Sequence, residues 1–118
     1  MSTLHLSVAG RTVEVDLADS APTRDLLAQL PLTLSFRDFG GQEKLATLPE
    51  PLSMDGVPAR SGAQAGDLGY YAPNNVLVLY YTDVGAYPGI VRLGRIAGSD
   101  LDLIRDQPDG FEVTITPR

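Results

Sequence analysis

The stretch LHLSVAGRTVEVDL (residues 4–17) indicates the architecture of the chain. Apolar and polar residues alternate on both sides of Ala9-Gly10, which is the pattern of two β-strands with one buried face each, joined by a tight turn. Pairing Val8 with Arg11 sorts the apolar side chains of both strands onto one face, so the stretch predicts an antiparallel hairpin. The facing pairs are then Leu6 with Val13, Leu4 with Val15, and His5 with Glu14.

Short alternating runs continue outward from this hairpin, punctuated by 12 Gly and 9 Pro. This spacing is typical of an all-β sandwich or barrel. Further strands are expected at residues 32–36, 44–48, 67–72, 76–81, 90–96 and 111–116, and short helices at residues 20–30 and after a Ser99 cap. The chain therefore predicts one mainly-β domain, residues 1–118, with seven or eight strands in a closed or nearly closed barrel.

Two stretches lack periodicity. Residues 49–66 contain three Pro and three Gly and predict a long loop, and residues 82–89 predict another irregular connection. A long loop inside a compact domain is often functional, so the first stretch is a candidate wall of a binding site.

The composition excludes several classes of protein. The chain has no Cys and one His, which rules out disulfides, thiol nucleophiles and multi-histidine metal sites. Its net charge of −6 argues against a nucleic-acid partner. No apolar run reaches the roughly 20 residues of a membrane span, and MSTLHLSVAG has no signal-peptide pattern. We therefore expect a cytoplasmic protein with no cofactor, no metal, no nucleic acid and no membrane partner.

Three blocks resemble the bacterial cyclophilin-like family of small uncharacterised proteins. They are LPLTLSFRDFGGQEKLATLPEPL (residues 30–52), AGDLGYYAPNNVLVLYY (65–81) and PGIVRLGRI (88–96). The resemblance implies a closed eight-stranded cyclophilin-like barrel with two short helices. The chain departs from the family at Ala72-Pro73-Asn74-Asn75, where relatives often carry a tryptophan and a glycine. It also lacks the phenylalanine–histidine–arginine run of catalytic cyclophilins, so their catalytic residues are not carried over.

All five tyrosines fall between positions 70 and 87. Because consecutive strand residues point to opposite faces, each of the pairs Tyr70-Tyr71 and Tyr80-Tyr81 places one ring inward and one outward. Outward rings of the two pairs are expected near one another, where they suit a ligand surface. The alternative is ordinary barrel packing.

Three arginines are further candidates. Arg37 follows outward positions of its strand and suits a carboxylate or a carbonyl, or else it forms a surface ion pair with Asp38 or Glu43. Strict alternation places Arg92 with Ile90 and Ile96, and Arg95 with Val91 and Leu93, so one arginine would have apolar neighbours. Gly94 between them either allows a close approach to the backbone or marks a bulge.

Other constellations are weaker. Gly40-Gly41 lacks the remainder of a phosphate loop. The aspartates have no calcium-loop spacing. His5 and Glu14 predict a cross-strand surface pair, and a nucleophilic role for Ser7 beside His5 is disfavoured.

These observations predict a domain that binds a small molecule or an extended peptide in an outer groove, without covalent chemistry. The alternatives are a prolyl isomerase and an accessory subunit that acts through a protein partner, and exposed strand edges also suggest a homodimer. The candidate ligand-binding residues are Arg37, Phe39, Glu43, Tyr70, Tyr80, Tyr87 and Arg92.

Overall fold

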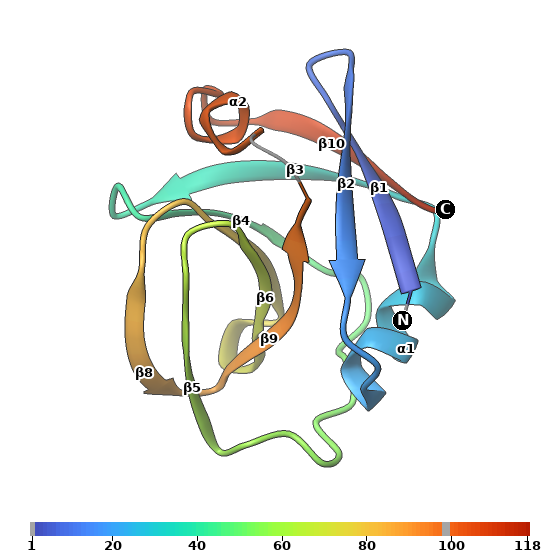
Figure 1. Ribbon diagram of the computed structural model, residues 1–118, viewed down its shortest axis with the longest axis vertical. Coiled ribbons are helices and arrows are strands. Elements are labelled where there is room, and N and C mark those ends of the chain that lie inside the picture. The colour runs from blue at the N-terminus through green and yellow to red at the C-terminus, as the bar shows by residue number, and fades with distance from the viewer. Residues whose placement is uncertain (1, 98–99) are drawn as a thin grey trace.

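The computed structural model describes residues 2–97 and 100–118. Its barrel strands are β1 (Ser2–Val8), β2 (Arg11–Leu17), β3 (Leu32–Phe39), β4 (Glu43–Thr47), β6 (Asp67–Tyr71), β7 (Val76–Tyr80), β9 (Ile90–Ile96) and β10 (Phe111–Pro117). They close in the order β1-β10-β3-β4-β7-β6-β9-β2, with every neighbouring pair antiparallel (Figure 1). The expected closed eight-stranded barrel is confirmed.

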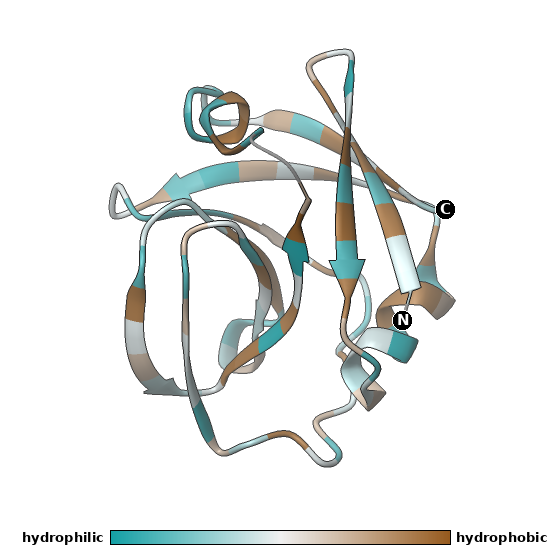
Figure 2. Cartoon of the chain, viewed as in Figure 1, coloured by the Kyte–Doolittle hydropathy of each residue, from teal (hydrophilic) through white to brown (hydrophobic). Residues whose placement is uncertain are grey.

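The β1–β2 hairpin has the register that the sequence predicts. Val8 pairs with Arg11, and the facing pairs Leu4–Val15, Leu6–Val13 and His5–Glu14 follow. Hydrophobic and hydrophilic bands alternate along both strands (Figure 2). The apolar side chains of this hairpin are fully buried in the barrel interior, whereas His5 Nε2 and Glu14 Oε2 lie 3.9 Å apart on the outside.

The two expected helices are present. Helix α1 (Ala21–Gln29) begins after Ser20, whose hydroxyl accepts a 3.3 Å hydrogen bond from the Thr23 amide, and it ends before Pro31. Helix α2 (Leu101–Arg105) follows Asp100, and the predicted Ser99 cap lies outside the described residues. Leu26 of α1 and Ile104 of α2 are fully buried in the barrel core, so both helices are anchored to the barrel.

The predictions for residues 49–66 and 82–89 need correction. Each contains a strand, β5 (Arg60–Ala63) and β8 (Val84–Pro88), and the two strands form a separate antiparallel ribbon outside the barrel (Figure 1). Gly62 permits their close contact, because a Cβ there would lie 2.8 Å from the Val84 carbonyl oxygen. Neither segment alternates, so only their pairing with each other makes them strands.

The ribbon covers a second apolar cluster, here called the outer cluster, on the outside of the barrel wall. β7 is buried along its whole length because Leu77 and Leu79 face the barrel interior while Val78 and Tyr80 face this cluster. The cluster consists of Leu45, Ala63, Val76, Val78, Tyr80 and Ile90, with Tyr71 and Val84 packed against them.

Strict alternation is wrong for β9. The pairing of β6 with β9 shifts between Leu68–Gly94 and Gly69–Arg92, so Leu93 is an extra residue. This bulge changes the phase of the strand. Val91, Leu93 and Ile96 therefore enter the barrel core, and both Arg92 and Arg95 are exposed.

Gly94 has both roles that the sequence suggests: it marks a bulge, and it allows a close approach to its backbone. It lies at the bulge, and it also pairs with Leu17 of β2 at the seam that closes the barrel. A Cβ at this position would lie 2.3 Å from the Asp16 carbonyl oxygen. The group that approaches the Gly94 backbone is therefore the neighbouring strand.

Candidate functional site

A cavity of about 630 Å³ lies between the outer face of the barrel and the β8 strand. We call it the outer pocket. Its volume lies within the roughly 300–1,000 Å³ that is typical of small-molecule sites. The lining residues come from β3 and β4, from the β6–β7 hairpin and from β8 and β9, and they are Phe39, Gln42, Glu43, Leu45, Tyr71, Asn74, Val76, Tyr80, Val84, Gly85, Ala86, Tyr87 and Ile90.

Four aromatic side chains line the outer pocket. Tyr71 and Tyr87 lie across from each other with ring centroids 6.3 Å apart at an angle of 45°. Tyr80 is 1% exposed, and its ring covers Gly69, where a Cβ would lie 2.7 Å from the ring. Phe39 and Tyr87 are 61% and 56% exposed, and large exposed apolar side chains beside a cavity are typical of a binding surface.

Glu43 is the carboxylate of this pocket. The strand registers place it directly opposite Phe39 on β3 and directly opposite Tyr80 on β7. Burial raises its pKa above the ordinary value, and the nearby charge of Asp38 adds to the effect. Burial likewise raises the pKa of the Tyr80 hydroxyl, with Glu43 contributing. This end of the pocket therefore presents the partly desolvated carboxyl group of Glu43 among aromatic rings.

The structure brings together four of the seven candidate residues, namely Phe39, Glu43, Tyr80 and Tyr87. The outward rings of the two tyrosine pairs, Tyr71 and Tyr80, both line the outer pocket, as the alternation predicts. No residue of the 49–66 segment is among the lining residues. β8 takes the place that was expected for that segment, because β5 pairs with β8 and places it against the wall.

Tyr70 lies inside the barrel instead. It is 1% exposed, and its hydroxyl donates a 2.8 Å hydrogen bond to Asn75 Oδ1 and accepts one of 3.2 Å from the Leu52 amide. Asn75 adopts a left-handed conformation, with φ 54°, and its side chain also donates to the Leu48 carbonyl. In this chain the Ala72–Asn75 turn thus holds Tyr70 through Asn75 and lines the pocket through Asn74.

Arg37 lies beside the outer pocket without lining it. It is exposed on β3, and its cross-strand partner is Leu45, a lining residue. Within the described part of the chain, the side chain of Arg37 has no ion pair with Asp38 or Glu43. Asp38 interacts instead with Lys44 and Tyr81.

Asp38, Lys44 and Tyr81 form a polar cluster at one end of the barrel. Lys44 is 4% exposed, and its Nζ donates a 2.8 Å hydrogen bond to the Gln107 carbonyl and lies 3.5 Å from Asp38 Oδ1. The Tyr81 hydroxyl donates to the same carboxylate. This hydrogen bond lowers the pKa of Asp38, while burial and the bond together raise the pKa of Tyr81 to about 12.

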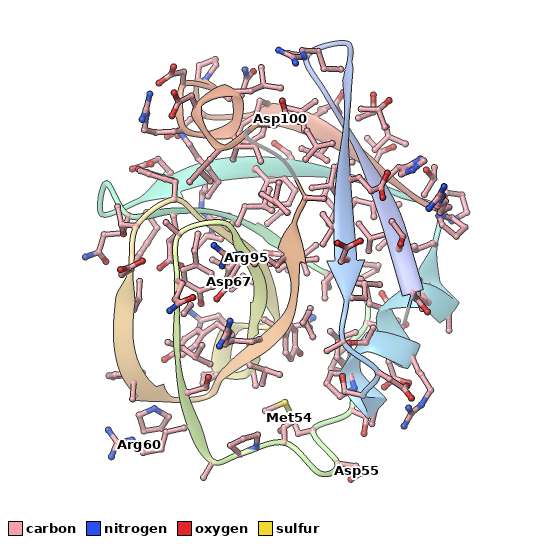
Figure 3. The ribbon with its side chains drawn as sticks, viewed as in Figure 1. Met54, Asp55, Arg60, Asp67, Arg95 and Asp100 are labelled. Atoms are coloured by element: carbon pink, nitrogen blue, oxygen red, sulfur yellow. The ribbon has the colours of Figure 1, made fainter. Side chains whose placement is uncertain are left out.

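Arg92 and Arg95 both bind Asp67, which is fully buried. Arg92 Nε lies 2.9 Å from one carboxylate oxygen, Arg95 Nη1 lies 3.0 Å from the other, and Asp67 and Arg95 lie beside one another (Figure 3). The Gln64 amide donates a further bond of 2.8 Å to the carboxylate. The carboxylate therefore has its charge paired, and this cluster fixes the bulged β6–β9 seam.

Sequence reasoning missed two features of the site. Tyr71 was one of two adjacent tyrosines, and no residue pattern distinguishes the inner ring from the outer one when both faces of a strand are covered. The Lys44 cluster had one usable signal, since Lys44 shares the inward face of β4 with Ala46, where a charged residue needs partners.

Two absences concern the described residues only. No helix there combines the length and apolar composition that crossing a membrane requires. Nor do residues 2–97 and 100–118 contain a group of three or more His, Asp or Glu side chains arranged to hold a metal ion.

The comparisons with known proteins agree with this architecture. Among solved structures, the chain is similar to the solution structure of a hypothetical protein from Archaeoglobus fulgidus. The TM-score is 0.71 and the sequence identity 16%, and the match covers 99% of this chain and 95% of the other. This likeness concerns the fold. The comparison with curated proteins found no match. The model of the cyclophilin-like family matches residues 6–116, which span nearly the whole barrel, and the chain therefore belongs to the cyclophilin-like family.

Proposed function

We propose that this protein is a binding domain that takes up a small organic molecule in the outer pocket without covalent chemistry. The observation that carries the proposal is the pocket itself, a cavity of about 630 Å³ with aromatic walls and few polar groups. Preformed cavities of this size and composition are the usual form of small-molecule sites. The exposed rings of Phe39 and Tyr87 at this cavity support the same reading, because a bound molecule would cover them.

The polar side chains of the pocket suit recognition better than a covalent reaction. Glu43, Gln42, Asn74 and the tyrosines can donate or accept hydrogen bonds. Among the described residues, the lining contains no Ser, Thr, Cys, Lys or His. Glu43 and the lining tyrosines remain as possible nucleophiles, and within the same residues none of these side chains has a hydrogen bond to an activating base. Orientation of a ligand by a few polar groups within an apolar wall is what this set supports.

A screen of water-soluble fragments by thermal shift, followed by isothermal titration, tests the proposal. Tyr87→Ala removes an exposed ring of the pocket, so we expect it to weaken the hits at least about fivefold while the melting temperature changes little. Met54→Ala is the matched control, since Met54 is also an exposed apolar side chain but does not line the pocket. Hits with affinities that Tyr87→Ala leaves unchanged would place the binding elsewhere.

A second candidate, prolyl isomerisation, is favoured by one observation. Arg37 lies on the outer face beside Leu45, so a twisted X-Pro peptide bond in the pocket would have an arginine next to it. The reaction needs no nucleophile, and the uncatalysed rate is slow, with times of tens to hundreds of seconds. An NMR exchange assay on a proline peptide would detect catalysis. No acceleration at micromolar protein, or the same acceleration by Arg37→Gln, would remove Arg37 from any such role.

A further inference from the structure

Glu43 has an unusual position for a surface carboxylate. Residues directly opposite in antiparallel strands have Cβ atoms about 4.5–5.5 Å apart on the same face. Glu43 is directly opposite Phe39 on one side and Tyr80 on the other, so aromatic residues flank the carboxylate across both neighbouring strands. Tyr71 and Tyr87 line the same pocket.

Within the described residues, the Glu43 carboxylate has no hydrogen bond or ion pair, although a lysine is next to it in sequence. The reason is geometric. Lys44 faces the interior of the barrel, where its Nζ binds the Gln107 carbonyl and Asp38. Glu43 is half-buried and bears the cost of desolvation, seen as a raised pKa, without the partner that usually accompanies a buried charge.

The charges around the outer pocket favour a positive ligand group. Of the described residues, the lining includes one carboxylate and no Lys, Arg or His, in a chain with a net charge of −6. Besides the inward-facing Lys44, two cations lie beside the pocket by register. They are Arg37, opposite the lining residue Leu45, and Arg60, opposite Pro88 next to Tyr87. Both are exposed, so water and salt screen their charges more than they screen the half-buried Glu43.

Aromatic rings together with a carboxylate recognise one ligand chemistry particularly well. The face of an aromatic ring attracts a cation, and quaternary and methylated ammonium groups are bound in cages of such rings. An alkylated ammonium also suits the apolar wall, because its methyl groups need no hydrogen-bond partners there. An anionic ligand would be repelled by the Glu43 carboxylate, and that carboxylate would remain without a partner.

We propose that the small molecule bound in the outer pocket carries an alkylated ammonium group, which lies against the aromatic rings and pairs with Glu43. This inference rests on the proposed function and assigns a chemical class to its ligand. The charge of Glu43 has no partner among the residues that the structure describes, and the ligand supplies one.

An NMR titration of the full chain with a matched pair of probes tests the inference. Choline carries a trimethylammonium group, and 3,3-dimethylbutan-1-ol has the same shape with a neutral tert-butyl group. We expect choline to shift the backbone resonances of residues 84–87 and to bind at least about tenfold more tightly than the alcohol, because only the cation gains from the rings and the carboxylate.

Two variants locate the effect. Glu43→Gln keeps the shape and removes the charge, so it should abolish most of the preference for choline. Because this change also removes a charge that folding desolvates, the melting temperature at neutral pH should not fall, which verifies that the variant is folded. Glu112→Gln makes the same change in net charge at an exposed position of β10 and should leave the preference intact.

The outcomes separate this inference from the proposed function. If the alcohol shifts residues 84–87 at least as strongly as choline, the ammonium assignment is overturned while small-molecule binding at the pocket stands. A preference for choline that survives in Glu43→Gln overturns the role of Glu43. If neither probe shifts these residues, the ammonium assignment fails as well, and the fragment screen alone decides whether the pocket binds small molecules.

Discussion

At the scale of single residues, the protein depends on a few positions where one atom decides the geometry. Gly94 is the clearest, because it lies both at the β9 bulge and at the β2–β9 seam. The bulge turns Arg92 and Arg95 to the same side, where they share the buried Asp67 carboxylate. A sequence pattern cannot show this arrangement, because strict alternation holds only while the strand register is unbroken.

Gly94→Ala should lower the free energy of unfolding by about 1–3 kcal/mol, the usual cost of forcing extra atoms into a packed site. The added Cβ would lie 2.3 Å from the Asp16 carbonyl oxygen and would push β2 away from β9. Urea unfolding measures the change. Gly85→Ala is the control, since a Cβ at Gly85 meets no atom within 4 Å. Equal stabilities of the two variants would show that the seam is not tightly packed at Gly94.

The Asp38–Tyr81 pair gives the protein a specific acid sensitivity. The Tyr81 hydroxyl holds the folded-state pKa of Asp38 below its ordinary value. A carboxyl with a depressed pKa stabilises the fold above its unfolded-state pKa of about 3.9, and this contribution is lost as the pH falls through the folded-state pKa.

Tyr81→Phe should therefore raise the pKa of Asp38 toward its ordinary value and move the midpoint of acid unfolding to higher pH. Carboxyl ¹³C resonances followed by NMR during an acid titration report the pKa directly. Tyr87→Phe serves as the control, because no hydrogen bond of its hydroxyl exists among the described residues. An Asp38 pKa that is the same in Tyr81→Phe and in the wild type would contradict the assigned cause.

At the scale of elements, strands with a clean two-residue period or a continuous apolar run could be read from the sequence. The β1–β2 hairpin, β7, and β10 follow from their patterns and were predicted almost to their ends. β5 and β8 could not be, because RSGA and VGAYP contain glycine or proline and have no apolar face of their own. Their strand structure comes from pairing across about 25 residues of chain, which local reasoning does not reach.

The residues in the turn of the β1–β2 hairpin are not the most stable choice for its backbone conformation. Ala9 and Gly10 have φ of 49° and 79°, so a residue with a Cβ occupies the left-handed region at Ala9. Asn tolerates that region better than Ala, and Asn-Gly is a preferred sequence for such turns. Relief of part of the roughly 1–2 kcal/mol cost of this region should make Ala9→Asn raise the free energy of unfolding by up to about 1 kcal/mol in a urea titration.

The opposite substitution tests the same reasoning. Ala9→Val places a β-branched side chain at a positive φ and should destabilise the hairpin, since such residues are genuine outliers there. If Asn and Val affected stability equally, the left-handed conformation of Ala9 in solution would be in question.

At the scale of the whole molecule, the barrel wall has an apolar outer face in addition to the apolar face that forms the barrel core. The barrel core contains no residue of β5 or β8, yet β7 presents a second apolar face outward, which is buried under the ribbon and beside the outer pocket. The concentration of tyrosines between positions 70 and 87 indicates this outer apolar face in the sequence. Which of them line the pocket depends on the strand order, and so does the placement of Glu43 between two aromatic residues.

A crystal structure of the protein with the tightest-binding molecule from the fragment screen tests the central claim most directly. We predict that the molecule lies between β8 and the β4–β7 wall, in contact with Tyr71 and Tyr87, and covers the rings of Phe39 and Tyr87 that are exposed in the free protein. A molecule bound only elsewhere, for example in the shallow depression of about 430 Å³ beside Arg92 and Arg95, would contradict the account.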